Sequence, residues 1–410
     1  MNIYSEIAPL RKVIVHRPGP EVERMTPETA KISLYNDIIP VEEVQKEHDG
    51  LVALLSRFTT VVEISEVIAE ALETLESRIR VTETLFPDNG LHRRILQELW
   101  GSCDGTTAAS HVVEGLPMPH TRLETVINGP EYLLPPLPNL YFTRDIGFVV
   151  GRNAFAGNMA HSVRTNESKL ASLAFAALSG SALPPARVPG NARIEGGDVL
   201  VFSPKLLVIG VGERTAAASV DSLIGSLLEN GTEEITVLAV LLPEGRATIH
   251  LDMIATLVDH HTLLAYTPFI AGQRPVQVFR IHAVQGRDWD VHEETDLVSA
   301  LGNCRYPVDL IPCGGSNRQQ QEREQWFSAC NSLALAPGKI VVYDTNPGTL
   351  DQLAKAGFNI VDTGSSTSGL SAMDEATADR MVFAVRGTEL ARGGGGPRCM
   401  TLPVERMETE

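Results

Sequence analysis

Residues 199–231 read VLVFSPKLLVIGVGERTAAASVDSLIGSLLENG, and the order of apolar run, turn and helix in this stretch decides the fold class. A β-rich apolar run leads to a glycine-containing turn, a threonine suited to cap a helix, and a stretch of helical period. Residues 145–180 and 339–364 repeat this order, and residues 11–30 look like a shorter relative. The recurrence predicts an α/β protein of repeated ββαβ-like units rather than one continuous Rossmann sheet. Because the period is irregular, a doubly wound sheet remains the alternative on pattern alone.

A helix-favouring stretch interrupts this pattern between residues 66 and 130. Its segments ESRIRVTETL, LHRRILQELWG and ASHVVEGL are amphipathic and rich in residues that favour helices. The following PEYLLPPLPNLYFTRD contains prolines that enforce extended backbone leading into the next strand. We therefore expect residues 1–65 and 131–410 to form the main α/β domain and residues 66–130 to form an inserted helical subdomain.

The composition is that of an ordinary globular protein and narrows the functional classes. The chain has 410 residues, of which 43% are hydrophobic and 21% are charged, and its formal net charge is −17. This negative charge argues against nucleic acid or an anionic membrane as the main partner. The opening residues show no signal-peptide pattern, and no apolar run approaches the length of a transmembrane helix. We expect a cytoplasmic protein.

The cysteines do not suggest a disulfide framework or a zinc site. There are five, at widely spaced positions and without a CxxC pair, namely Cys103, Cys304, Cys313, Cys330 and Cys399. Cys399 is distinctive because it closely follows four consecutive glycines, residues 393–396. A glycine run costs backbone entropy to order, so this segment indicates a disordered tail, a loop that backbone approaches closely, or a mobile lid with a reactive thiol.

Further polar clusters are widely separated in the sequence, and each alone has an ordinary structural explanation. They are NLYFTRD at 139–145, EGGD at 195–198 and HLD at 250–252, in addition to the segment that carries Cys399. An aspartate can pair with a neighbouring arginine, a glycine pair can form a tight turn, and a lone histidine can be a satisfied core residue. Only the combination of these clusters indicates a catalytic site.

Together the clusters supply the groups that a cysteine nucleophile needs. His250 is a proton donor and acceptor that could approach the cysteine in space. Asp145, Glu195 and Asp252 would repel one another in an empty pocket and become favourable when a cation lies between them. A planar guanidinium suits such carboxylates because its N–H groups pair with them in bidentate fashion. The set therefore predicts a substrate with a cationic, planar, electrophilic carbon atom.

An ordered series of motifs along nearly the whole chain carries a resemblance to a known family. The motifs are HRPG, TPE, EHD, PPLPNLYFTRD, IEGGDVL, GVGERT, HLDM, CGGSN, EREQW and RGGGGPRCM. In this order they resemble the arginine deiminase family of the guanidine-modifying superfamily. The resemblance implies a five-bladed, pseudo-symmetric α/β propeller of ββαβ-like units with a helical insertion.

The resemblance also implies roles for the residues of the clusters. Cys399 matches the nucleophile, His250 the general acid and base, and Glu195 the acid that orients the histidine and substrate. Asp145 and Asp252 match the carboxylates that hold the guanidinium nitrogens. The implied reaction converts L-arginine to L-citrulline and ammonia through a covalent thiouronium on the cysteine.

Three further residues match positions that bind the amino-acid end of the substrate, namely Asn139, Arg164 and Arg214. No metal or organic cofactor is implied. The expected partners are L-arginine and further copies of the chain in a dimer or tetramer. Residues 393–396 become a candidate hinge that closes the cysteine loop on the substrate. Arg398, Arg392, the histidine or the substrate's own charge could favour the thiolate, which is the reactive form of the cysteine.

Two positions depart from the family pattern and leave other functions open. Asn36 stands where members commonly have an aspartate, and Gly394 stands where many have an arginine. The alternatives are hydrolysis of a modified arginine or another guanidino compound, and amidino transfer, in which an amine replaces water. A catalytically silent arginine-binding protein is a third, although the joint presence of all five candidate catalytic residues argues against it.

Overall fold

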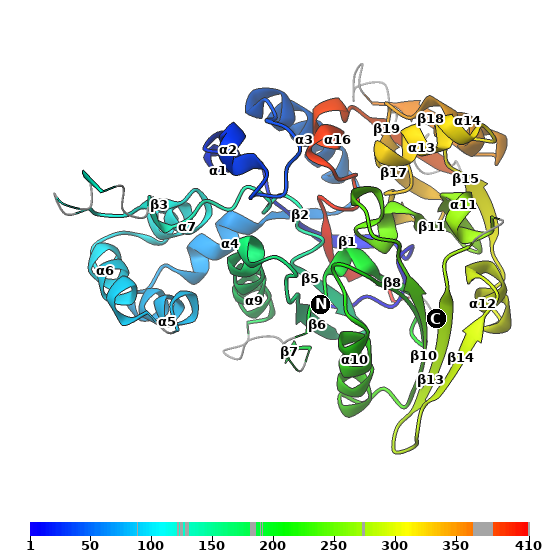
Figure 1. Ribbon diagram of the computed structural model, residues 1–410, viewed down its shortest axis with the longest axis horizontal. Coiled ribbons are helices and arrows are strands. Elements are labelled where there is room, and N and C mark those ends of the chain that lie inside the picture. The colour runs from blue at the N-terminus through cyan, green and yellow to red at the C-terminus, as the bar shows by residue number, and fades with distance from the viewer. Residues whose placement is uncertain are drawn as a thin grey trace.

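The structure is a computed structural model that describes residues 1–87, 89–120, 123, 126–127, 131–180, 186–188, 190, 192–272, 275–363 and 380–408. Figure 1 shows short sheets around the middle of the molecule and helices mostly outside them. The described residues form five sheets of three or more strands and one two-stranded sheet. The α/β class predicted from the sequence is confirmed, and the alternative of one doubly wound sheet is wrong because the sheets are separate.

The five larger sheets share one pairing order. In each, two strands pair in antiparallel fashion, and a strand that follows a helical connection then pairs in parallel with the second of them. This is the predicted ββαβ-like recurrence. Strand β17 (Lys339–Tyr343), which pairs on both of its edges, is largely apolar and buried, as expected of a strand that is covered on both faces.

The two units nearest the centre of the sequence follow the predicted segments. The first contains β5 (Gly147–Val150), β6 (Asn153–Ala156), η1 (Ser162–Arg164), α9 (Thr165–Ser179) and β7 (Ala186–Arg187). The second contains η2 (Gly196–Asp198), β8 (Val199–Ser203), β9 (Leu206–Val211), α10 (Ala217–Glu229) and β10 (Glu234–Leu241). Helix α9 ends at Gly180, whose φ of 63° is the left-handed conformation that glycine adopts without strain.

The next two units complete the C-terminal half. One contains η3 (Arg246–Thr248), η4 (Leu251–Met253), β11 (Ala255–Asp259), β12 (Thr262–Ala265), α11 (Thr267–Ile270), α12 (Leu297–Asn303) and β15 (Asp309–Pro312). The other contains α13 (Arg318–Trp326), β16 (Leu333–Ala336), β17, α14 (Pro347–Lys355), β18 (Asn359–Asp362) and β19 (Met381–Val385). Strands β13 (Val278–Val284) and β14 (Asp290–Glu294) instead extend the sheet of β10.

The remaining unit joins the two ends of the chain. Strand β1 (Leu10–Val15) pairs in antiparallel fashion with β20 (Leu402–Arg406) and in parallel with β2 (Thr60–Glu63). The connection carries α1 (Pro20–Glu23), α2 (Pro27–Ala30) and α3 (Val41–Leu55), and α16 (Thr388–Gly393) precedes β20. Figure 1 accordingly shows the blue α3 beside the red α16.

Helices occupy most of the predicted insertion and project to one side in Figure 1. They are α4 (Ile64–Ala71), α5 (Leu75–Leu85), α6 (Gly90–Trp100) and α7 (Gly105–Val113), followed by β3 (Leu116–Pro117) and β4 (Tyr132–Leu134). Leu96, Trp100 and Val112 share a hydrophobic core with Phe175 of α9. Residue 88 and most of residues 121–130 lie outside the described part, as does Gly364 of the third repeated segment. The boundaries of a separate subdomain stay a prediction.

Within the described ranges, no helix has both the length and the apolar character that crossing a bilayer requires.

Candidate active site

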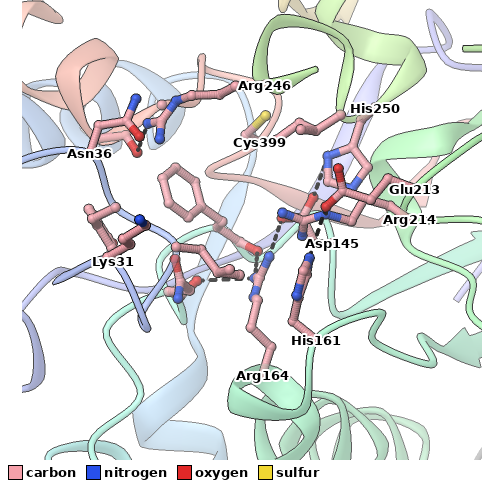
Figure 2. A pocket seen from close by; sticks show the side chains of 17 residues that line it. Lys31, Asn36, Asp145, His161, Arg164, Glu213, Arg214, Arg246, His250 and Cys399 are labelled. Atoms are coloured by element: carbon pink, nitrogen blue, oxygen red, sulfur yellow. Dashed lines mark hydrogen bonds and ion pairs between the residues drawn. The ribbon is translucent and has the colours of Figure 1, made fainter. Parts of the chain in front are cut away.

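The predicted site residues converge because equivalent turns of the five units lie close to one another. In each unit, the turn that precedes the first strand carries one residue of the site. These residues are Asp145 before β5, Glu195 before β8, His250 before β11, Asn331 before β16 and Cys399 before β20. Asp145, His250 and Cys399 line a pocket of about 250 Å³, which Figure 2 shows from close by. Residues far apart in sequence thus meet at one point of the fold.

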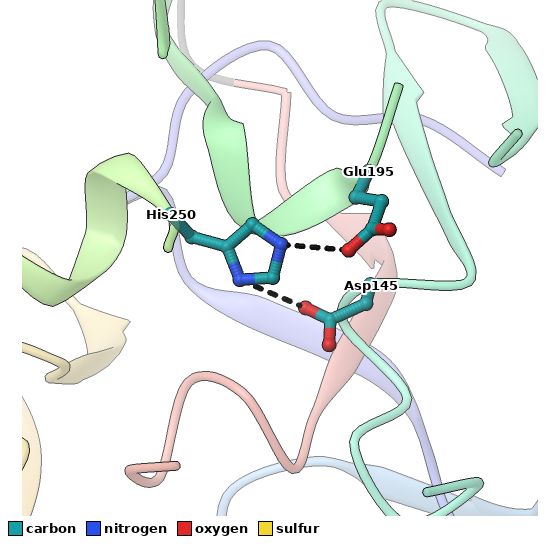
Figure 3. A group of neighbouring side chains, drawn as sticks. All are labelled: Asp145, Glu195 and His250. Carbon is teal, nitrogen blue, oxygen red and sulfur yellow. Dashed lines mark hydrogen bonds and ion pairs between the residues drawn. The ribbon is translucent and has the colours of Figure 1, made fainter. Parts of the chain in front are cut away.

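The His250 ring lies between two carboxylates, as Figure 3 shows. Its Nε2 is 2.8 Å from Oε2 of Glu195, and its Nδ1 is 3.6 Å from Oδ1 of Asp145. Burial opposes protonation of the ring, but the charge of Asp145 and the hydrogen bond to Glu195 outweigh it and raise the pKa of His250 to about 9. The ring is therefore an imidazolium at neutral pH, ready to donate a proton.

Glu195 is fully buried and fixed by several donors. Its Oε1 accepts the backbone N–H of Ala160 at 2.9 Å, and its Oε2 accepts Nη1 of Arg214 at 3.3 Å. Burial alone would raise the pKa of this carboxyl, but the bond to His250 and the charge of Arg214 lower it to about 2. Glu195 therefore stays ionised and holds the histidine in its charged form.

Cys399 lies in the same pocket as His250, with its sulfur near a carboxylate. Its Sγ is 3.9 Å from Oδ2 of Asp252, and its backbone N–H donates to Oδ1 of Asn331 at 3.0 Å. Burial raises the pKa of the thiol well above its usual value, and the charges of Asp252 and Asp145 add to this. A backbone hydrogen bond from Gly396 and the charge of Arg398 lower the pKa of the thiol but do not outweigh these effects. At rest the cysteine is a neutral thiol.

Each of the two aspartates keeps one buried oxygen without a hydrogen bond. Oδ2 of Asp145 is held by Arg164 at 2.6 Å, and Oδ2 of Asp252 is held by Arg398 at 2.8 Å. Their Oδ1 atoms are buried and accept no hydrogen bond within the described residues. Buried carboxylate oxygens are normally satisfied, so these two atoms favour a ligand that brings N–H donors and positive charge.

Asn139, Arg164 and Arg214 also line the pocket, as the sequence predicts. The Asn139 amide donates to the carbonyl of Ser33 at 2.9 Å. Arg164 makes four hydrogen bonds, to the carboxylates of Asp145 and Glu167 and to two backbone carbonyls. Most of its donors are therefore used inside the protein. Arg214 pairs with Glu195 through Nη1 and with Glu213 through Nε, and these ion pairs leave its Nη2 unused.

His250 and the two carboxylates beside its ring also form a possible metal-ligand group. One ligand atom each from Asp145, Glu195 and His250 lie within 4.8 Å of one another. A protonated imidazole has no free lone pair for a metal, and Arg164 and Arg214 already pair with the two carboxylates. The donor set fits a hydrogen-bonded proton relay better than a metal centre.

Comparison with known proteins places the chain in a family. The family model for arginine deiminase matches residues 33–406. The chain belongs to the arginine deiminase family. The arginine deiminase of Streptococcus gordonii is 31% identical over 428 residues, covering 100% of this chain and 98% of the relative. That of Streptococcus pneumoniae serotype 19F (strain G54) is 32% identical with the same coverage. The protein is accordingly a hydrolase that acts on C–N bonds of a linear amidine.

Solved structures of guanidino-modifying enzymes share the fold. The N-terminal domain of ArgZ, an arginine dihydrolase of cyanobacteria bound to its product, has a TM-score of 0.54 at 16% identity and covers 96% of this chain and 97% of its own. DDAH from Pseudomonas aeruginosa, a mutant complexed with citrulline, has a TM-score of 0.53 at 14% identity and covers 96% and 99%. At these identities the similarity supports the α/β fold alone.

Sequence reasoning assigned no role to three residues that the structure places at or next to the arginine deiminase site. Asn331 contacts Cys399, Arg246 lines the pocket, and Glu6 pairs with Arg398 behind it. Asn331 follows the motif EREQW by a few positions, so the family resemblance could have indicated it. Arg246 and Glu6 have no local signal, because their contacts depend on how distant turns meet.

Proposed function

We propose that this enzyme hydrolyses free L-arginine to L-citrulline and ammonia through a covalent intermediate on Cys399. The observation that carries the proposal is that the Oδ1 atoms of Asp145 and Asp252 are buried and accept no hydrogen bond within the described residues. Asp145 lies beside the protonated His250, and Asp252 lies beside Cys399. A guanidinium would supply N–H donors to both oxygens and place its carbon between them. The curated relatives carry the name arginine deiminase, and solved neighbours are described as bound to L-arginine or citrulline.

The proposed reaction begins when the bound guanidinium lowers the pKa of Cys399, whose proton leaves to solvent. The thiolate attacks the guanidinium carbon, and His250 donates a proton to the nitrogen that departs as ammonia. The remaining S-alkylthiouronium is a cation that Asp145 and Asp252 continue to hold. The neutral His250 then takes a proton from water as the water oxygen adds to the carbon. The adduct collapses to the ureido product, breaking the C–S bond, and its hydroxyl proton passes to the departing sulfur of Cys399. A structure of the ArgZ domain is described as covalently bound to a reaction intermediate.

We assign Asn139, Arg164 and Arg214 to the amino-acid end of the substrate. All three line the pocket, which supports the assignment. Arg214 can contribute the unpaired side of its guanidinium, while Arg164 also orients Asp145 through their 2.6 Å ion pair.

We further propose the five-bladed propeller arrangement, with residues 1–65 and 131–410 as the catalytic domain and residues 66–130 as a helical subdomain. The shared pairing order of five sheets and the equivalent positions of the site turns support this arrangement. A cytoplasmic homo-oligomer stays a prediction from the sequence.

A second candidate is hydrolysis of a modified arginine or another guanidino compound. A neighbouring cavity of about 310 Å³ shares Asn36, Arg246 and Gly394 with the lining of the main pocket. Asn36 and Gly394 are the two positions that depart from the family pattern, so a substituent on the substrate could extend past them. Amidino transfer would use the same groups with an amine in place of water.

Product analysis by mass spectrometry tests the proposal. Purified enzyme incubated with L-arginine without added metal should give citrulline and ammonia in equal amounts, faster than with agmatine or methylated arginines. Cys399→Ala should lower turnover by at least about 10⁴-fold, whereas Cys304→Ala, outside the pocket, should retain activity. Faster conversion of a methylated arginine would favour the second candidate. Near-normal turnover by Cys399→Ala would overturn the covalent mechanism.

A further inference from the structure

The charges that line the pocket are unevenly distributed. Asp145 and His250 lie on one side of it, and Figure 2 shows Arg246 and Lys31 on the other. On the side of Asp145 and His250, the carboxylates of Asp145 and Glu213 also line the pocket, and the arginines there, Arg164 and Arg214, are paired with carboxylates. A substrate with a cationic end and an anionic end would match this distribution.

Among the arginines that line the pocket, Arg246 is the one without a carboxylate partner within the described residues. Arg164, Arg214 and Arg398 each pair with two carboxylates. Within the described residues, the guanidinium of Arg246 donates only to the carbonyl of Gly393 at 3.4 Å and lies 6.0 Å from the centroid of the Trp326 ring. A half-buried cation without an anion is costly, so the site favours an anionic ligand here.

The backbone at Gly394 makes room for this guanidinium. A Cβ atom at residue 394 would lie 2.5 Å from Nη2 of Arg246, and the φ of Gly394 is +103°. A side chain at this position would therefore displace the guanidinium and strain the backbone. The glycine allows Arg246 to occupy the edge of the pocket.

We propose that Arg246 binds the carboxylate of the substrate and thereby makes the enzyme select guanidino acids over guanidines that lack a carboxylate. The inference rests on the proposed function and adds a specificity residue to it. Arg246 presents N–H donors to the pocket, and an α-carboxylate can accept a pair of them. The ring of Trp326 limits the positions that the guanidinium can take, which favours one binding geometry.

Lys31 lines the same side of the pocket as Arg246, but its side chain is exposed. Water and salt screen an exposed ammonium more than the half-buried Arg246. We therefore expect Lys31→Gln to weaken carboxylate binding much less than Arg246→Gln.

A binding cycle tests the role of Arg246 without requiring turnover. Titration calorimetry would measure the affinity of Cys399→Ala for L-arginine and for L-argininamide, which has the same shape but no carboxylate charge. We expect L-arginine to bind about 10- to 100-fold more tightly. In the double variant Cys399→Ala/Arg246→Gln this preference should fall several-fold, with Arg214 still present at the amino-acid end, and Arg246→Lys should restore part of it. Equal weakening of both ligands, or no change, would overturn the proposal.

Kinetics of the otherwise native enzyme give a second readout. Arg246→Gln should raise the KM for L-arginine at least about tenfold and change kcat little, because the contact persists from bound substrate to transition state. Arg323→Gln is a matched control, because Arg323 also lies against an aromatic ring, that of Phe327, but outside the pocket. If the native enzyme does not convert L-arginine, the proposed function fails, and the binding cycle still decides whether Arg246 recognises a carboxylate.

Discussion

Burial acts on Cys399 and His250 in the same direction, towards the neutral form, but their neighbours produce different outcomes. The carboxylates around His250 overcome burial and keep the ring charged, whereas Asp252 and Asp145 reinforce burial at the thiol and keep it neutral. In the free enzyme, His250 is therefore protonated and can donate a proton to the departing nitrogen, whereas Cys399 is not yet the reactive thiolate. A bound guanidinium changes the charge beside the sulfur and favours the thiolate. Reactivity thus depends on the presence of a cationic substrate.

The charge of His250 gives a prediction about pH. Its pKa is about 9, above the usual value of 6.5, so the ring should remain protonated at pH 8 and lose its proton near pH 9. Because the folded pKa is raised, the stabilisation from this proton is complete below about pH 6.5 and is lost as the pH rises through 9. NMR titration of labelled histidine, with the signal assigned through His250→Asn, would measure the midpoint.

Glu195→Gln provides the matched variant for this titration. The amide keeps the shape of the side chain but removes the negative charge that accepts the proton of Nε2 at 2.8 Å. The pKa of His250 should fall, and kcat at pH 8 should fall with the fraction of protonated ring. A midpoint below pH 7 in the native enzyme would contradict the assignment of His250 as the resting acid.

The identity of the charged site residues could be predicted from the sequence, but their pairing could not. Asp145, Glu195 and His250 are polar residues between apolar runs, and a common cationic substrate explains them together. The partners that set their charge come from distant turns, such as Arg164 for Asp145. Arg398 is an example of a pairing that the sequence does not indicate. It precedes Cys399 in the chain, but its guanidinium pairs with the carboxylates of Glu6 and Asp252.

The glycine run before Cys399 has a packing role in addition to its predicted role as a hinge. In the described conformation, Cβ atoms at residues 395 and 396 would lie within 3.0 Å of atoms of Phe142, Cys399 and Asn331. Gly393 would similarly meet the Tyr141 hydroxyl at 2.3 Å. Of the three explanations drawn from the sequence, close approach of backbone and side chains accounts for these positions. The movement of the loop stays a prediction.

This packing predicts that Gly396→Ala impairs catalysis more than folding. The new methyl group would lie 2.6 Å from Cβ and Oδ1 of Asn331, whose Oδ1 accepts the N–H of Cys399. Displacement of the cysteine by a fraction of an ångström to about 1 Å should lower kcat up to about 10²-fold. Overpacking should cost about 1–3 kcal/mol of unfolding free energy. Steady-state kinetics and urea unfolding would separate the two effects.

Gly225→Ala is the control for that substitution. Gly225 lies within α10, and a Cβ there would meet nothing within 4 Å. The variant should keep its kcat and gain about 0.5–1 kcal/mol of stability, as alanine favours a helix over glycine. If Gly396→Ala retained full kcat with an unchanged unfolding midpoint, the close contact with Asn331 would not matter for the position of Cys399.

The strand and helix order of the repeated segments could also be predicted from the sequence, because each segment contains its own turn and cap. The segment at residues 199–231 corresponds to β8, β9 and α10. The pairing of β1 with β20 has no such local signal, since the two strands lie at opposite ends of the chain. Long-range pairing of this kind depends on tertiary packing rather than on periodicity.

The two ends of the chain are also joined by a buried ion network behind the site. Arg398, close to β20, pairs with Glu6, close to β1, at 3.1 Å and with Asp252 at 2.8 Å. Burial opposes the charge of Glu6, but Arg398 and Arg144 outweigh it and lower the pKa of Glu6 to about 2. The same ion pairs therefore connect the two ends of the chain and fix the position of Asp252, whose carboxylate lies beside Sγ of Cys399.

Removing the central cation should damage both stability and activity. Arg398→Met would leave the carboxylates of Glu6 and Asp252 buried without their partner, at a cost of about 3–5 kcal/mol. Asp252 would also lose the contact that fixes its Oδ2 near Sγ of Cys399, so kcat should fall with stability. Chemical unfolding at pH 7 would measure the first effect.

Glu6→Gln tests the same network through its acid dependence. Because the folded pKa of Glu6 is depressed, its contribution is present above about pH 4.5 and is lost as the pH falls towards 2. The native enzyme should therefore exceed Glu6→Gln in unfolding free energy by about 3 kcal/mol at pH 6, and this difference should shrink steadily between pH 4.5 and 2.5. A difference that stays constant over that range would mean that the Glu6 carboxylate contributes packing but no charge to the closure of the chain.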